Sequence, residues 1–171
     1  MQRTFASLSA QQVLGIAISI EERNAEIYHR FAEMFTEFGD QDSLEIASVF
    51  WEMAIEERGH HALLQRKFWE QYGSSSPSYT EEELVELIEV PRLSQSDVFA
   101  GDNGVPARQR ALQVALHAEM NARQFYSDLV EQTPDSPLRQ TYYELAQMED
   151  GHIAFLESKQ VDDSAETPLI Q

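Results

Sequence analysis

The chain contains no cysteine. This absence excludes a disulfide framework, a zinc ribbon, an iron–sulfur cluster, a thiolate haem ligand and a cysteine nucleophile. Any metal ion would therefore have to be held by histidine and carboxylate side chains, which are the remaining common ligands.

Basic residues and long apolar runs are also scarce. The 12 Lys and Arg residues face 30 Asp and Glu residues, which gives a formal charge of −18. Because such a charge repels phosphate backbones and anionic lipid, we expect neither a nucleic-acid partner nor a membrane role. The N-terminal segment lacks the apolar stretch of a signal peptide, and no apolar run is long enough to span a bilayer. We expect a cytoplasmic protein whose natural partners are cations.

Glycine and proline are few, with seven and six residues in a chain of 171, which suits a single compact fold. Apolar residues recur instead at helical spacing over long stretches. This periodicity predicts four helices, at about residues 9–38, 43–72, 106–132 and 137–160.

Capping signals mark the ends of the first two predicted helices. Ser9 and Gln12 match a capping box, and Gly39 is a stop signal. Asp42 and Glu45 suit the cap of the second helix. The short connection between these helices predicts an antiparallel hairpin.

The second and third predicted helices are joined by a long connection. Residues 73–105 are rich in Ser, Pro, Gly and Asp, with a short helix predicted after Thr80. Pro106 suits the first turn of the third helix, and Ser136 and Pro137 suit the start of the fourth. The sequence therefore predicts an all-α, antiparallel four-helix bundle with a long crossover between its second and third helices.

The two halves of the sequence repeat each other. Glu21 aligns with Glu119, 98 positions later, and Glu57 aligns with Glu149, 92 positions later. The difference between these offsets indicates that the repeating unit is a helical hairpin whose connections differ in length. We expect each hairpin to supply half of one core.

Each predicted helix carries one glutamate within its apolar stripe. On a helical wheel the first of these, Glu21, is surrounded by apolar residues: Leu14, Ala17, Ile18, Ala25, Tyr28, Ala32 and Phe35. The equivalent glutamates of the other helices are Glu57, Glu119 and Glu149. Because an ionised carboxylate in a core costs several kcal/mol without a partner, four such groups require compensating positive charge.

Two histidines suggest how that charge is supplied. His60 and His152 follow Glu57 and Glu149 by three residues, a spacing that brings both side chains to one point beside the helix. Two divalent ions would balance the four carboxylates. Carboxylate and imidazole ligands without thiolate suit iron or manganese, with zinc as an alternative.

Three other residue groups have different interpretations. A third Glu-x-x-His pair, Glu26 and His29, lies on the polar face of its helix and is interpreted as an ordinary solvated pair. His61 is interpreted as a half-buried histidine, with metal binding as the alternative. Arg123 either pairs with a ligand carboxylate or extends to solvent.

A family resemblance adds to this pattern. Residues 17–28 and 115–126 both begin Ala-(Ile/Leu)-x-x-Glu and end in (Ile/Phe)-Tyr. With the Glu-x-x-His pairs, these motifs resemble the ferritin-like di-iron carboxylate proteins, and most of all their rubrerythrin-type branch. The likeness covers about residues 10–160, so we assign residues 1–160 to one ferritin-like domain and residues 161–171 to a flexible C-terminal tail.

The resemblance implies roles for individual residues. Six side chains would bind two iron ions: Glu21, Glu57, His60, Glu119, Glu149 and His152. Tyr28 and Tyr126 would orient the ligand carboxylates, or are simply aromatic residues of the core.

The sequence departs from rubrerythrins proper at two points. Ala122 stands where those proteins carry an additional glutamate, which puts their peroxidase behaviour in doubt for this chain. The four-Cys rubredoxin domain that feeds them electrons has no counterpart in a sequence without cysteine. Electrons would have to come from an external donor protein or from Fe(II) itself.

The resemblance implies a di-iron oxidoreductase that oxidises Fe(II) with dioxygen or hydrogen peroxide, as a ferroxidase or a peroxidase. Two alternatives stay open: an iron-binding or storage protein without significant turnover, and a structural bundle stapled by metal. We also expect a homo-oligomer, either a dimer or a larger assembly.

Overall fold

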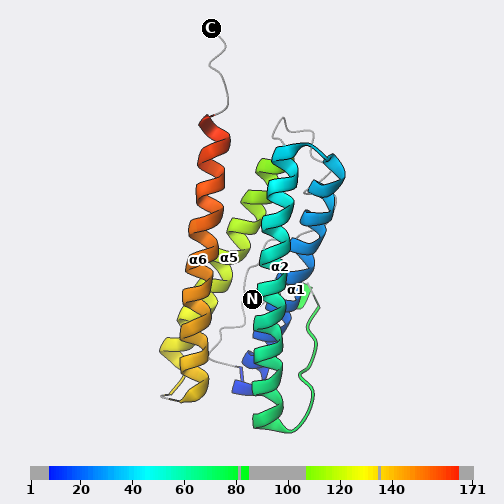
Figure 1. Ribbon diagram of the computed structural model, residues 1–171. Coiled ribbons are helices and arrows are strands. Elements are labelled where there is room, and N and C mark those ends of the chain that lie inside the picture. The colour runs from blue at the N-terminus through cyan, green and yellow to red at the C-terminus, as the bar shows by residue number, and fades with distance from the viewer. Residues whose placement is uncertain (1–7, 81, 85–106, 135, 166–171) are drawn as a thin grey trace. The chain divides into compact units, whose positions relative to one another are not determined.

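The computed structural model describes residues 8–80, 82–84, 107–134 and 136–165. Four long helices, α1, α2, α5 and α6, account for most of these residues, and the described ranges contain no strand (Figure 1). The chain divides into two compact units, Met1–Val90 and Pro91–Gln171, each of which is described here by itself. No helix in the described ranges is long and apolar enough to cross a membrane.

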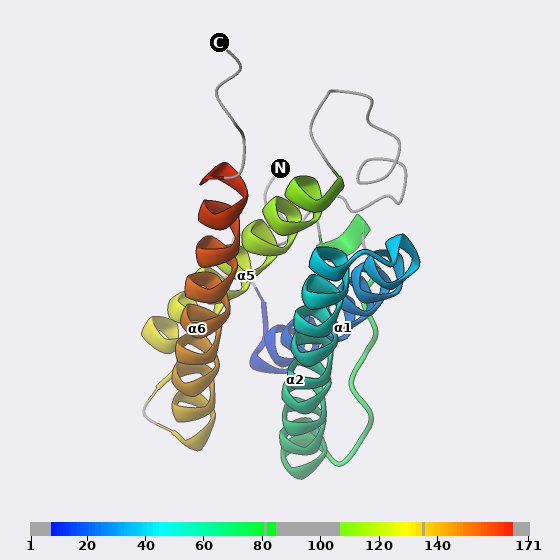
Figure 2. The same cartoon turned by 45° about the horizontal axis from the view of Figure 1, so that its top comes forward.

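The first unit contains α1, Ala10–Phe38, and α2, Gln41–Tyr72, which lie side by side as the predicted antiparallel hairpin (Figures 1 and 2). Ser9 caps α1 through a reciprocal capping box: its Oγ accepts a hydrogen bond from the Gln12 backbone N–H, and Gln12 Oε1 accepts one from the Ser9 N–H. Gly39 ends the helix in the left-handed conformation, with φ 73°. The predicted signals at both ends of α1 are confirmed.

The start of α2 differs from the prediction. Asp40, and not Asp42, is the capping residue, because its Oδ1 accepts a hydrogen bond from the Ser43 backbone N–H at 2.9 Å. Asp42 lies inside the first helical turn, where a negative charge is still favourable. Gly73, with φ 64°, ends the helix at the predicted position.

The apolar stripe predicted for α1 is buried. The core of the first unit includes residues from both helices: Leu14, Ala17, Ile18, Ala25, Tyr28, Ala32, Phe35, Ile46, Phe50, Met53, Leu64 and Phe68. The charged residues on the opposite side of α1, among them Glu22, Glu26 and Glu33, are exposed. Burial of one helix face against the other is the main stabilising contribution in such a hairpin.

A second face of α1 is covered by the segment that follows α2. Gly15 allows this close approach, because a Cβ atom there would lie 3.0 Å from Pro77 Cγ and 3.1 Å from a ring carbon of Tyr79. The Tyr79 backbone N–H donates a hydrogen bond to Ser19 Oγ at 3.2 Å. This segment thus closes over a side of α1 that α2 leaves open.

The short helix predicted after Thr80 begins as expected. Thr80 and Glu83 form a reciprocal capping box, residues 82–84 are helical, and Leu84 is buried. The continuation of this helix lies outside the described residues.

The second unit is a hairpin of α5, Ala107–Gln132, and α6, Pro137–Ala165, which also lie side by side (Figure 2). Pro137 is the first residue of α6, as predicted, and Ser136 Oγ accepts a hydrogen bond from the Arg139 N–H. The helix α6 extends beyond the predicted end near Gln160, since no proline or glycine lies between Gln160 and Pro168. Pro106 lies outside the described residues, and the assignment of 1–160 to one domain with a flexible tail stays a prediction.

The core of the second unit is built from small and aromatic side chains. Those buried are Ala111, Leu112, Ala115, Ala118, Ala122, Phe125, Tyr126, Leu129, Tyr142, Leu145, Ala146 and Leu156. Leu116, Val130 and Leu138 remain partly exposed. They flank the stripe, where a wheel argument is least decisive.

Candidate metal centre

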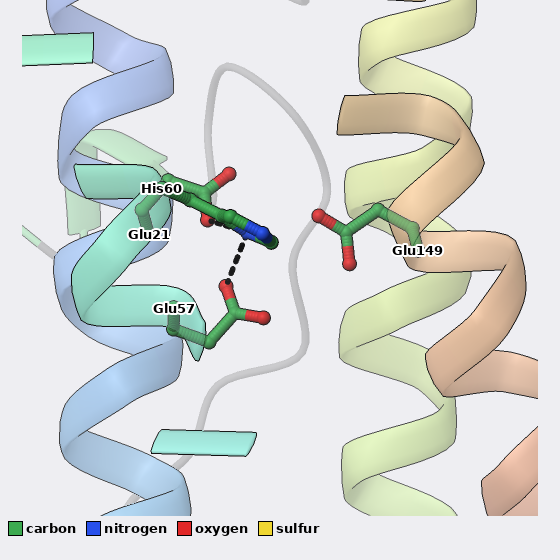
Figure 3. A group of neighbouring side chains, drawn as sticks. All are labelled: Glu21, Glu57, His60 and Glu149. Carbon is green, nitrogen blue, oxygen red and sulfur yellow. Dashed lines mark hydrogen bonds and ion pairs between the residues drawn. The ribbon is translucent and has the colours of Figure 1, made fainter. Parts of the chain in front are cut away.

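Three polar side chains meet inside the first unit. Glu21 projects from α1 and is 0% exposed, while Glu57, 0% exposed, and His60, 8% exposed, project from α2. His60 Nδ1 lies 3.2 Å from Glu21 Oε2 and 3.8 Å from Glu57 Oε2 (Figure 3). The three residues each place one ligand atom within 4.8 Å of the others. We call Glu21, Glu57 and His60 the first triad.

The helical hairpin explains how these residues meet. Glu21 lies at the centre of the buried stripe of α1, so its side chain cannot avoid the interior. Glu57 and His60 are three residues apart and lie on one face of α2. The antiparallel pairing of the two helices then brings that face against Glu21.

Burial and charge perturb the titration of the first triad. Burial, together with the neighbouring charge of Glu57, raises the pKa of Glu21 well above its ordinary range. Burial lowers the pKa of His60, but its hydrogen bonds and charge interactions with Glu21 and Glu57 outweigh that effect and raise the pKa to about 10. Without a metal ion, a protonated His60 therefore supplies one positive charge beside the two buried carboxyl groups.

The second unit contains the same arrangement. Glu119 projects from α5, and Glu149 and His152 project from α6; all three are buried, and His152 is 9% exposed. His152 Nδ1 lies 3.3 Å from Glu119 Oε2 and 3.3 Å from Glu149 Oε2. One ligand atom from each again lies within 4.8 Å of the others. We call Glu119, Glu149 and His152 the second triad.

Comparison with known proteins identifies the family. A family model described as Rubrerythrin matches residues 12–101, which is more than half of the chain. The chain belongs to the rubrerythrin family. Members of this family bind di-iron centres and are typically di-iron oxidoreductases.

Two solved structures share the fold of this rubrerythrin-family chain. A hypothetical protein from Pyrococcus furiosus is 24% identical, with a TM-score of 0.67 over 91% of this chain and 90% of its own. An uncharacterised conserved protein from Magnetospirillum magnetotacticum is 19% identical, with a TM-score of 0.70 over 96% of this chain and 100% of its own. No curated protein matches. The predicted all-α, ferritin-like helical bundle is confirmed.

The side chains of each triad suit a divalent metal ion. Two carboxylates and one imidazole offer hard oxygen and nitrogen ligands, and one divalent ion per triad would balance the two negative charges. The His Nδ1 atoms that face the carboxylates are the atoms that would bind the ion, since a metal would replace the proton there. The buried Glu/His cluster is thus compatible with the di-iron centre of rubrerythrins.

The two tyrosines predicted to support the ligands are fully buried. Tyr28 stacks on Phe50 with ring centroids 6.0 Å apart, and Tyr126 stacks on Tyr142 at 6.1 Å. These contacts fit the interpretation as core aromatics, and a role in orienting carboxylates stays a prediction.

The other polar residues singled out from the sequence lie elsewhere. Glu26 is exposed, and His29 contacts Glu33 at 3.3 Å, as expected for a solvated group. Arg123 is exposed, in keeping with its extension to solvent, and its Nε donates to Oδ1 of Asp150, which is not one of the predicted ligands, at 3.0 Å.

His61 is half-buried, which fits its interpretation from the sequence. One buried polar residue was not predicted at all. Asn24 lies on the buried face of α1, one turn after Glu21, and is 1% exposed. The sequence does carry a signal for this burial, because Asn24 lies only about 60° from Glu21 on the helical wheel.

Proposed function

We propose that the first and second triads together hold two iron ions and that the protein is a di-iron oxidoreductase. The ligands would be Glu21, Glu57, His60, Glu119, Glu149 and His152. The observation that carries this proposal is a buried triad of two carboxylates and one imidazole in each of two repeated hairpins.

The cost of burial supports metal binding. A buried carboxylate costs several kcal/mol unless it is paired, and each triad contains two. A protonated histidine offsets only one of these two charges, whereas a divalent ion offsets both. Manganese and zinc accept the same ligand types, but family membership favours iron.

The proposed reaction is oxidation of Fe(II) by dioxygen or hydrogen peroxide. Two ferrous ions held there would supply one electron each, which with two protons suffices to reduce one hydrogen peroxide to two waters. The protein's own contribution is positional: α1 and α2 fix Glu21 against Glu57 and His60, and the surrounding apolar side chains exclude water.

The source of electrons and the assembly state belong to the same proposal. These 171 residues contain no cysteine to hold a rubredoxin-type iron site, so we assign re-reduction to an external donor protein or to fresh Fe(II). A homo-oligomer is proposed because apolar side chains stay exposed on both units, including Trp51, Ile55 and Met148. We propose a cytoplasmic location on the sequence grounds given above.

Anaerobic titration with Fe(II) tests the proposal. We expect two irons per chain, followed by the near-ultraviolet absorption of an oxidised di-iron centre when oxidant is added. A faster response to hydrogen peroxide than to air would indicate a peroxidase, and the reverse a ferroxidase. Fewer than one iron per chain would refute the proposal, and continued uptake into a large iron core would favour storage.

A further inference from the structure

Asn24 is a buried amide on α1, three residues after Glu21 of the first triad. It is 1% exposed, and its Nδ2 has no hydrogen-bond partner among the residues that the structure describes. A buried donor without a partner destabilises the folded state, because the hydrogen bond to water that it loses is not replaced. A residue of this kind calls for an explanation outside folding.

The position of Asn24 on the buried face of α1 directs its side-chain amide toward Glu21. The two residues are three positions apart on the buried face of α1, and helical side chains lean toward the helix N-terminus. The Asn24 side chain therefore lies over the turn that carries Glu21. In the sequence repeat the equivalent position is Ala122, so only one hairpin carries this amide.

Ser19 shows how a structural polar residue behaves on the same helix. It is also buried, and its Oγ accepts a hydrogen bond from the Tyr79 backbone N–H at 3.2 Å. That bond holds the segment after α2 against α1. The Nδ2 of Asn24 makes no comparable bond within the described residues.

We propose that Asn24 is a positioning residue whose Nδ2 donates a hydrogen bond to a small oxygen-containing molecule, of the hydrogen peroxide class, that enters the first triad beside Glu21. The inference rests on the proposed function and deepens it. Ionised carboxylates only accept hydrogen bonds, so they can bind the O–H groups of such a molecule but cannot donate to its lone pairs. A neutral amide supplies the missing donor without altering the charge that balances the metal ions.

The test compares Asn24→Leu, which is close to isosteric, with the wild type and with Ser19→Ala as a matched control. Azide serves as the probe, because it accepts a hydrogen bond and gives a visible band with ferric iron. We expect Asn24→Leu to bind two irons per chain but to bind azide about tenfold more weakly, the loss typical of one hydrogen bond. Ser19→Ala should keep the azide affinity.

Unfolding of the metal-free proteins in urea gives a second readout. Because Asn24→Leu removes an unpaired donor, its midpoint should equal or exceed that of the wild type, whereas Ser19→Ala should unfold earlier. Asn24→Ala, which copies Ala122, serves as a second variant if leucine does not fit. Early unfolding of both Asn24 variants would assign the residue a structural role and overturn the inference.

The outcomes separate this inference from the proposed function. If the wild type binds no iron pair, the proposed function fails and this inference fails with it. If the wild type binds iron and azide, and Asn24→Leu binds azide equally well, only the role of Asn24 is refuted.

Discussion

The Nδ1 atom of His60 lies 3.2 Å from Oε2 of Glu21, although the two residues are 39 positions apart in the sequence. The same relationship recurs between His152 and Glu119, at 3.3 Å and a separation of 33 positions. Each hairpin thus joins a carboxylate of its first helix to the Glu-x-x-His pair of its second. If these pairs hold a metal centre, substitutions and changes of pH should have the measurable effects described below.

Glu149→Ala should abolish stable binding of a metal pair, because it removes a buried carboxylate from the second triad. Iron per chain after anaerobic loading and desalting is the measurement. Glu26→Ala is the control, since Glu26 is an exposed glutamate near a histidine and should change little. Equal losses in both variants would contradict the distinction between inward and outward glutamates.

The metal-free protein should lose stability as the pH rises from neutral to alkaline. The folded-state pKa of His60 is about 10, against an ordinary 6.5, so its contribution is complete below pH 6.5 and is lost as the pH approaches 10. The raised pKa of Glu21 acts in the same direction, because ionising that carboxyl inside the core is unfavourable.

Urea unfolding at about pH 6.5 and about pH 9 measures this dependence, which amounts to a few kcal/mol at most. His60→Gln should flatten the profile between those values, since it removes the titrating imidazole. A wild-type protein that gains stability toward alkaline pH would rule out the charge arrangement described for the first triad.

Asp40→Ala should destabilise the protein by about 1 kcal/mol, because it removes the acceptor for the Ser43 N–H at the start of α2. Asp42→Ala is the matched control, two residues later in the first turn of α2. It should cost less, since Asp42 is not the capping residue and lies in the first turn of α2, where an acidic residue gains from the helix dipole. Chemical denaturation of both variants gives the order, and a larger effect at Asp42 would reverse the capping assignment.

Gly15→Leu should destabilise the first unit by about 1–3 kcal/mol, the usual range for overpacking. Its side chain would collide with Pro77 and Tyr79 and displace the segment held by Ser19. Gly59→Ala is the contrasting variant, because nothing lies within 4 Å of a Cβ atom there. That change should stabilise α2 by roughly 0.5–1 kcal/mol, as measured by thermal or urea unfolding.

Periodicity in the sequence was sufficient to predict the helices and the direction of the glutamates. The stripe around Glu21 is buried because its apolar residues recur at a spacing that only one helix face can present. The position of each histidine followed from the three-residue spacing on one helix. These features depend on local geometry, which a wheel captures.

Features that depend on contacts between distant segments were not predictable. The burial of Gly15 and Ser19 required knowing that residues 77–79 return to cover α1, and no periodicity encodes that return. Asp40 replaced Asp42 as the cap because several acidic residues compete at one helix start, and the choice depends on backbone angles. The end of α6 was misplaced because helix ends fray gradually when no breaker is present.

The turn between α1 and α2 consists only of Gly39 and Asp40, and both residues are fixed by their capping roles. A turn of two fixed residues cannot accommodate a change in chain length. One inserted residue between Asp40 and Glu57 would rotate Glu57 and His60 by about 100° about the axis of α2 and carry them off the face that meets Glu21. An insertion at residues 74–76, beyond the end of α2, would leave that phase intact. The alignment of the first triad therefore depends on the number of residues between the fixed turn and Glu57. This dependence makes α2 intolerant of insertions and deletions even where it tolerates substitution.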